Sequence, residues 1–285
     1  PINNDIVENN IVFQKGTPRI MRKLNNSVLS LLTGGAGNSN YWHWMFDVLP
    51  RLNLCNKFIK LNEIDYFLLP SLSKKFQIES LNLLNIPNKK RISSEKFRHV
   101  KVKKLIVTDH PVVTTGNASI DIQNIPRWIT QWLKESFVDK NSLNKKENIK
   151  KVFIERKINK NGSIPFRFIE NEEEVKACLL MRGFRPVILE DISFKEQISL
   201  FQNADCIVGL HGAGFANLSF CNPGIKVIEL RSHSSGSVIE NLAKKLDLNY
   251  FSLVTKSEEV HKFQSPNQQG KIRVSIKNLI KLLEN

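Results

Sequence analysis

Hydrophobic residues along the chain occur in short blocks separated by amphipathic stretches. In the first half, the apolar blocks SVLSLL, DYFLLP and KKLIVT (residues 27–32, 65–70 and 103–108) predict three buried strands. The segments between them predict a helix in the aromatic stretch around His43 and a second helix over about residues 73–84. A further helical period covers residues 122–137.

The second half alternates more regularly. Strands are predicted at KVFIE, PVILE, DCIVGL, KVIEL and NYFSLV (residues 151–155, 186–190, 205–210, 226–230 and 249–254). Helices are predicted over residues 171–184, 193–204 and 237–246, in a short stretch after Gly214, and over about 271–283. Ser193 and Glu196 form a capping box at the start of one helix. Repeated strand–helix units with short loops predict parallel sheets that are covered on both faces.

A polar, lysine-rich stretch without an apolar period, VDKNSLNKKENIKK, separates the two halves. It predicts a domain boundary, with an N-terminal domain over residues 1–140, a linker over 141–150 and a C-terminal domain over 151–285. The expected fold class is α/β, with two Rossmann-like domains whose parallel sheets face a central cleft.

Composition narrows the class of protein and its partners. The 285 residues are 41% hydrophobic and 24% charged, which is typical of a globular protein, and no run approaches the roughly 18 to 20 apolar residues that span a bilayer. The net charge of +15 favours an anionic partner, either nucleic acid, a membrane surface or a substrate. No nucleic-acid-binding motif accompanies the lysines, so we expect no specific nucleic acid partner; a solvated basic surface is the alternative. The four cysteines lie in apolar surroundings without a C-x-x-C pair, as expected of core cysteines in a reducing compartment.

The stretch HGAGFAN follows a predicted strand of the second half and is the strongest candidate for an anion site. Gly212 and Gly214 allow close approach of the backbone, and the helix that follows would point free N–H groups at a phosphate or diphosphate. His211, Ala213 and Asn217 belong to the same stretch. The spacing is not G-x-G-x-x-G, so the dinucleotide fingerprint is absent. The alternative is a tight turn that requires glycines.

Two other strand ends of the second half carry charged candidates. Arg156 and Lys157 follow the strand KVFIE, where a guanidinium fork and an ammonium group suit a diphosphate, unless they lie in an ordinary solvated loop. Glu229, near the end of KVIEL, is suited to accept hydrogen bonds from both hydroxyls of a ribose, or alternatively to pair with Arg231.

In the first half, the loop TGGAGN, with Gly35 and Asn38, precedes the aromatic stretch NYWHWMFDVLPRL and can present backbone amides to a ligand. At 100° per residue, a polar stripe runs along the helix that this stretch predicts, and aromatic and aliphatic residues cover the rest. The stripe consists of Asn40, His43, Asp47 and Arg51.

Such a narrow stripe indicates a cleft-lining face, on which Asp47 orients His43 as a catalytic base. A buried pair that only satisfies itself is the alternative. Asp109 and His110, in a turn after KKLIVT, form a second candidate pair. There is no D-x-D, P-loop, G-x-S-x-G or H-E-x-x-H sequence, and no metal site is expected.

The stretches NYWHWMFDVLPRL, VFIERK and HGAGFANLSFCNPGIKVIEL, in this order and spacing, resemble glycosyltransferase family 61. The resemblance covers residues 38–231 and implies a GT-B fold, with a nucleotide sugar held mainly by the second domain and transfer with inversion at the anomeric carbon. The positions matching the family pattern include the four stripe residues, Arg156, His211, Gly212, Gly214, Asn217, Pro223, Gly224 and Glu229. Glu155 departs from it, because relatives more often carry a small hydroxyl residue there.

The expected activity is a metal-independent inverting glycosyltransferase without a cofactor, acting on a nucleotide-diphosphate sugar, with UDP as the expected nucleotide. The expected acceptor is a glycan or lipid-linked hydroxyl, anionic in view of the basic charge, in bacterial capsule or lipopolysaccharide synthesis. The expected location is the cytoplasm, with peripheral association at an anionic inner membrane. A non-catalytic module that binds phosphorylated glycans or nucleic acid is the alternative, and the missing fingerprint disfavours a nicotinamide oxidoreductase.

Overall fold

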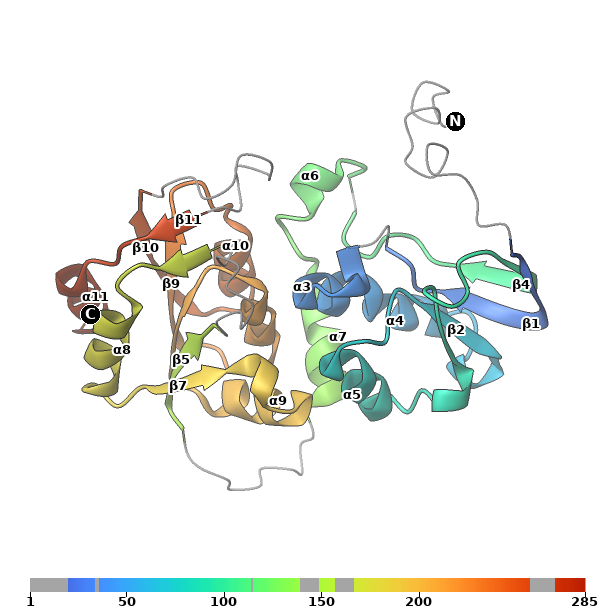
Figure 1. The fold of residues 1–285 in the computed structure, drawn as a ribbon, viewed down its shortest axis with the longest axis horizontal. Coiled ribbons are helices and arrows are strands. Elements are labelled where there is room, and N and C mark those ends of the chain that lie inside the picture. Colours follow the sequence, from blue (N-terminus) through green and yellow to red (C-terminus); the bar gives the residue numbers. More distant parts are fainter. Residues whose placement is uncertain are drawn as a thin grey trace.

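The computed structural model describes residues 20–33, 36–113, 115–138, 149–156, 167–256 and 270–284. Within these ranges, the strands form three sheets in which every paired neighbour is parallel. The predicted α/β class with parallel, Rossmann-like sheets is therefore confirmed. Figure 1 shows the two larger sheets on opposite sides of the molecule, with helices between them.

The sheet of the first half has the strand order β3-β2-β1-β4. Its strands are β1 (Arg22–Ser30), β2 (Tyr66–Leu69), β3 (Arg91–Ser93) and β4 (Val100–Val107). The apolar pattern predicted three of these; β3 was missed because three residues are too short to show a period. Strands β2 and β3 are added on one side of β1, and β4 is then added on its other side, so the strand order reverses between β1 and β4.

The sheet of the second half has the order β10-β9-β8-β5-β7. All five strands were predicted: β5 (Lys151–Glu155), β7 (Arg185–Ile188), β8 (Cys206–Leu210), β9 (Lys226–Ser232) and β10 (Asn249–Thr255). Here the order changes direction between β5 and β8. A small extra sheet of β6 (Arg167–Ile169) and β11 (Gly270–Ile272) was not foreseen, and the last helix, α11 (Ile276–Glu284), begins only after β11.

Most predicted helices are present with shorter bounds: α5 (Lys75–Leu83), α8 (Glu172–Leu180), α9 (Phe194–Asn203) and α10 (Val238–Lys245). The capping box at Ser193 and Glu196 is confirmed. The helix predicted over residues 122–137 begins only at α7 (Arg127–Phe137), with a separate turn α6 (Ala118–Asp121) before it. Pro126 explains the break, because a proline disfavours helical geometry in the residue before it and is suited to a helix start.

One buried aromatic core joins the two halves. Figure 1 shows α7 between the two large sheets, and Phe137 at its end packs edge-on against Phe194 and Phe220 of the second half, with ring centroids 5.1 Å and 6.2 Å away. Lys134 of α7 also donates to the Cys221 carbonyl at 2.8 Å. The largest core cluster contains residues of both halves, so the facing sides of the sheets are held by a single apolar layer. The proposed domain boundaries stay a prediction, because most of the linker lies outside the described residues.

The prediction that helices cover both faces of each sheet is wrong for the first half, as far as the described residues go. The side of that sheet facing away from α4 (Pro50–Asn56) and α5 carries only a small apolar cluster around Val28, Leu68 and Ile92. Leu105 and Val107 of β4 are 59% and 64% exposed. None of the described helices has both the length and the apolar character to cross a membrane.

Candidate active site

The strand orders define two places where a ligand is expected. In open parallel sheets, neighbouring loops diverge at the carboxyl ends of the two strands between which the order reverses, and ligands bind there. In the second sheet these strands are β5 and β8, which are followed by Arg156 and by residues 211–214. In the first sheet they are β1 and β4, followed by the glycine-rich loop and by residues 108–110. Candidate site residues that come from separate sequence motifs therefore follow neighbouring strands of the same sheet.

A cleft of about 740 Å³ lies between the two halves. The first half contributes residues 39–41, 73–76 and Glu79. The second half contributes the ends of β5, β7 and β8, namely residues 154–156, 188–190, 210 and 212–215, together with Arg167, Ile192 and Gln197. His211, a predicted site residue, is buried behind this lining. Of the predicted polar stripe, Asn40 lines this cleft, whereas His43, Asp47 and Arg51 lie one to three turns further along the chain.

The aromatic stretch is not the regular α-helix that was predicted. It consists of a single turn α3 (Tyr41–His43), a π-helical segment η2 (Trp44–Val48) and then α4. Leu49 N donates to Trp44 O at 3.0 Å, five residues back. Pro50 accounts for the wider turn, because it has no N–H to donate to the Phe46 carbonyl and its ring would collide with that carbonyl in an α-helix.

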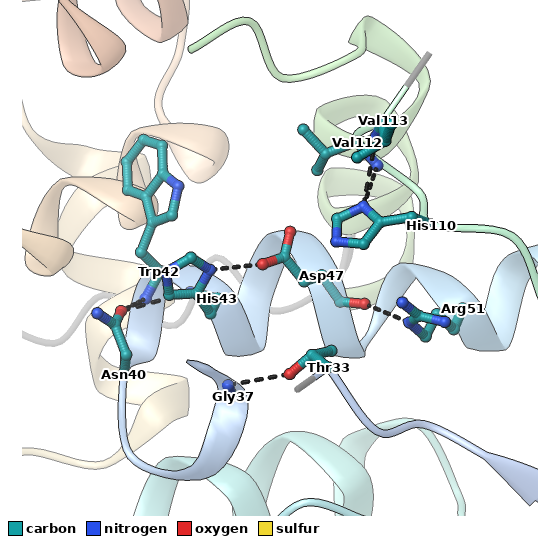
Figure 2. A network of polar contacts seen from close by, with 10 residues as sticks. All are labelled: Thr33, Gly37, Asn40, Trp42, His43, Asp47, Arg51, His110, Val112 and Val113. Atoms are coloured by element: carbon teal, nitrogen blue, oxygen red, sulfur yellow. Dashed lines mark hydrogen bonds and ion pairs between the residues drawn. The ribbon is translucent and has the colours of Figure 1, made fainter. Parts of the chain in front are cut away.

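The predicted pairing of His43 with Asp47 is present despite the wider turn (Figure 2). His43 Nδ1 and Asp47 Oδ2 are 2.5 Å apart, and the side chains are 22% and 5% exposed, respectively. Asn40 caps the turn, accepting from Trp42 N at 2.9 Å and His43 N at 3.4 Å. Because the carboxylate engages Nδ1, the second ring nitrogen of His43 remains to exchange a proton with a ligand.

Arg51 ties this pair to the end of β4. Its Nε donates to Asp47 O at 2.9 Å, and one terminal nitrogen donates to Thr108 O at 3.3 Å. Arg51 is 6% exposed, so it is part of the site's framework rather than a free cation. Burial lowers the pKa of Arg51, and the charge of Asp47 opposes this.

His110 joins the same site, but without Asp109. Its Nδ1 accepts from Val112 N and Val113 N, both at 3.3 Å, and Figure 2 shows the ring near Asp47. Among the described residues, His110 and Asp109 form no hydrogen bond or ion pair with each other, and both side chains are exposed. Burial lowers the pKa of His110, which Asp47 counteracts and Arg51 and His43 reinforce.

In the second half, Arg156 lies against the glycine turn. Its guanidinium donates to His211 O, and a Cβ at Gly212 would overlap the guanidinium, so glycine here leaves room for Arg156 in this position. Burial lowers the pKa of Arg156 to about 10, with Arg167 reinforcing the effect and Glu172 and Glu190 opposing it, so the side chain stays charged at neutral pH. Lys157 and Gly35, two further predicted site residues, lie outside the described residues, whereas Asn38 is exposed in η1 (Ala36–Asn38).

Glu229 orients His211 and does not face the cleft. It is fully buried; one carboxylate oxygen engages His211 Nδ1, and the other accepts from the Tyr250 hydroxyl. Burial, followed by the charge of Glu229, raises the pKa of Tyr250. Glu229 is therefore not positioned to contact a ribose in the cleft. It does not pair with Arg231 either, because Arg231 donates to Ser235 O.

Asn217 is also enclosed and connects the two halves. It is 0% exposed; its Oδ1 accepts from the Tyr41 hydroxyl at 2.5 Å and its Nδ2 donates to Gln197 at 3.0 Å. Tyr41 belongs to the turn that carries His43, and Asn217 belongs to the segment after Gly212. This contact therefore links the two predicted sites rather than leaving Asn217 open to a donor.

The segment after Gly212 differs from the predicted α-helix. Residues Ala213–Phe220 form the 3-10 helix η6. Residues 215–220 are all buried, so tertiary packing rather than helix propensity sets its turns. The first residues of this segment still line the cleft beside Arg156. The expected dipole of a regular α-helix is absent here, because the segment is a 3-10 helix.

Five charged residues of the cleft were missed from sequence: Lys74, Lys75, Glu79, Arg167 and Glu190. Glu190 lies just after β7, so the strand-end rule that selected Arg156 would have found it as well. The two lysines precede and start α5 on the opposite wall, and no sequence motif marks them.

These features define an α/β protein with parallel sheets and a cleft at the carboxyl ends of the strands of its second sheet. A family model described as Glycosyltransferase 61 matches residues 41–228, from α3 to β9. The match covers more than half of the chain, and the chain belongs to glycosyltransferase family 61. Membership implies transfer of a sugar from a donor to a glycan acceptor. No curated protein sequence matches the chain.

The link between Tyr41 and Asn217 can be tested by substitution. Asn217→Ala should lower the free energy of unfolding by about 1–3 kcal/mol, because it leaves the Tyr41 hydroxyl and the Gln197 side-chain oxygen without these hydrogen bonds. Urea denaturation would measure this, with the exposed Asn222→Ala as control. Tyr41→Phe should cost less in the Asn217→Ala background than in the wild type. Unchanged stability together with lost nucleotide binding would contradict this role.

Proposed function

We propose that the protein is an inverting glycosyltransferase of GT-B architecture that uses a nucleotide-diphosphate sugar, with UDP as the nucleotide. The observation that supports the proposal is the cleft between the two halves, which is lined by Arg156 and the glycine turn on one side and by Asn40 and Tyr41, at the start of the turn that carries His43, on the other. In this arrangement the second half holds the donor and the first half presents the acceptor.

The donor's diphosphate binds against Arg156 and the amides after Gly212. A guanidinium fork matches two phosphate oxygens, and its packing on a glycine fixes its direction. His211 precedes this turn, and its ring is fixed by the buried Glu229 while its carbonyl accepts from Arg156. Lys157 adds a further positive charge after β5 in this proposal. These groups stabilise the negative charge that develops on the diphosphate as it leaves.

His43 and Asp47 supply the base. The second ring nitrogen of His43 takes the proton from the acceptor hydroxyl while Asp47 stabilises the resulting imidazolium. The acceptor oxygen forms a bond to the anomeric carbon from the side opposite the leaving diphosphate, and the bond from that carbon to the phosphate oxygen breaks, which inverts the configuration. Arg51 of α4 holds the backbone of Asp47 in place and anchors it to Thr108 at the end of β4.

The cellular role is proposed from charge and cysteine content. The net charge of +15 favours an anionic glycan or lipid-linked acceptor, as in bacterial capsule or lipopolysaccharide synthesis. All four cysteines are buried and unbridged, which fits a cytoplasmic enzyme. The same charge supports peripheral association with an anionic inner membrane.

Removing the guanidinium should separate phosphate recognition from nucleoside recognition. We expect Arg156→Ala to weaken binding of a nucleoside diphosphate by about tenfold to a hundredfold, as for a charged hydrogen bond, and to leave nucleoside binding nearly unchanged. Isothermal titration calorimetry with UDP and uridine would measure both. Arg273→Ala, at an exposed arginine of the second half, is the matched control. Equal losses for UDP and uridine would show that Arg156 does not recognise phosphate.

Catalysis should depend on both members of the pair. Asp47→Asn and His43→Ala should each reduce turnover by at least about 10²-fold, the lower figure for loss of a general base, with donor affinity and Tm little changed. Asp47→Asn preserves shape at a residue that is 3% exposed. If both variants remain active, or both fail to fold, the pair is structural and His110 is the next base to test.

Activity should persist in the presence of EDTA. The sequence has no D-x-D, and in our proposal Arg156 and backbone amides take the place of a divalent cation at the diphosphate. The measurement is the rate of nucleotide release with and without chelator. Loss of activity that manganese restores would refute this part of the mechanism.

A further inference from the structure

One carboxylate in the cleft is available to a ligand. Three acidic residues line the cleft, and two are engaged: Glu79 accepts from Phe194 N at 2.6 Å, and Glu155 accepts from Lys176 at 2.7 Å. Glu190, in η5 (Leu189–Asp191) after β7, is exposed, and among the described residues no hydrogen bond or ion pair involves its carboxylate.

The chemistry of the cleft changes along its length. It extends across the ends of β8, β5 and β7, which are neighbours in the sheet in that order. Arg156 and the glycine turn stand at the ends of β5 and β8 and supply donors for phosphate. At the end of β7 the lining becomes apolar, with Ile188 and Ile192, and Phe76 belongs to the opposite half. Apolar side chains also line the ends of β5 and β8, but Ile188 and Ile192 lie on the far side of Arg156 from the glycine turn in the strand order.

Glu190 belongs to the β7 end of the cleft but stays close to Arg156. Its negative charge acts on the guanidinium and opposes the lowering of the pKa of Arg156. A nucleotide whose diphosphate lies on Arg156 and whose base lies on the isoleucines would place its ribose between the two. That is the position in which an exposed carboxylate can accept from hydroxyls.

We propose that Glu190 accepts hydrogen bonds from the 2′- and 3′-hydroxyls of the donor's ribose. This inference rests on the proposed function and adds a recognition element to it: Glu190 contacts the ribose of the nucleotide, so 2′-deoxyribonucleoside donors are disfavoured. A site that hydrogen-bonds a substrate hydroxyl discriminates against the analogue without it, because a polar group of the site is then left unpaired. Glu190 thus takes the ribose-binding role that the sequence analysis gave to Glu229. Both carboxylate oxygens of Glu229 already bind buried partners, His211 and Tyr250.

Calorimetry on the full chain tests this assignment. The nucleoside diphosphate that binds most tightly among UDP, GDP, CDP and ADP is compared with its 2′-deoxy form and with pyrophosphate. We expect the wild type to prefer the ribo form by about tenfold or more, the effect of one hydrogen bond to a charged group. Glu190→Ala should weaken ribo binding and abolish the preference, so that the ribo and deoxy forms bind equally, and it should not weaken pyrophosphate binding. Glu173→Ala, at an exposed glutamate of α8, should keep the preference.

The outcomes separate this inference from the proposed function. A wild type that binds ribo and deoxy forms equally overturns the role of Glu190 but leaves the donor site standing. A Glu190→Ala variant that keeps the preference for the ribo form also overturns the role of Glu190, because the carboxylate would then not contact the ribose. A variant that loses pyrophosphate binding as well overturns it too, because Glu190 would then act through Arg156. A wild type that binds no nucleoside diphosphate overturns the proposed function and this inference together.

Discussion

The site depends on an aromatic contact that holds two parallel sheets in a fixed relation. Phe137, at the end of α7, packs against Phe194 and Phe220, so the last helix of the first half is anchored to the second half at its end. Because ligand loops leave both sheets at their carboxyl ends, the cleft exists only while this core keeps those ends opposed. The Tyr41–Asn217 hydrogen bond adds a polar contact at the same junction. Packing energy thus fixes the geometry on which any chemistry relies.

Buried partners orient the polar groups of the site. Glu229 holds His211 from the interior, Arg51 holds the backbone at Asp47, and Gly212 leaves room for the guanidinium of Arg156. Each of these interactions fixes a group before a ligand arrives, which lowers the cost of reorganisation during reaction. Residues that share one family pattern therefore have two different tasks: some face the cleft, and others support them from behind.

Sequence patterns predicted the parallel α/β class and all five strands of the second sheet, because buried parallel strands are continuous apolar runs. They also predicted the His43–Asp47 pairing, since a spacing of four residues survives the π-helical turn. They could not separate cleft-facing from supporting residues: Glu229 and Asn217 match the family motif but are enclosed. Local periodicity does not report which partners tertiary packing brings to a side chain, such as Tyr41 for Asn217 or the two valine amides for His110.

The edge of the first sheet at β4 affects how copies of the protein interact with one another in solution. Among the described residues, β4 is an edge strand, and Leu105 and Val107 are exposed on it. Such an edge is a template for pairing with a strand from another copy. Lys101, Lys103 and Lys104 are exposed on the same strand, and their like charges oppose that pairing between identical chains. Part of the basic charge therefore serves colloidal stability, independently of any anionic substrate.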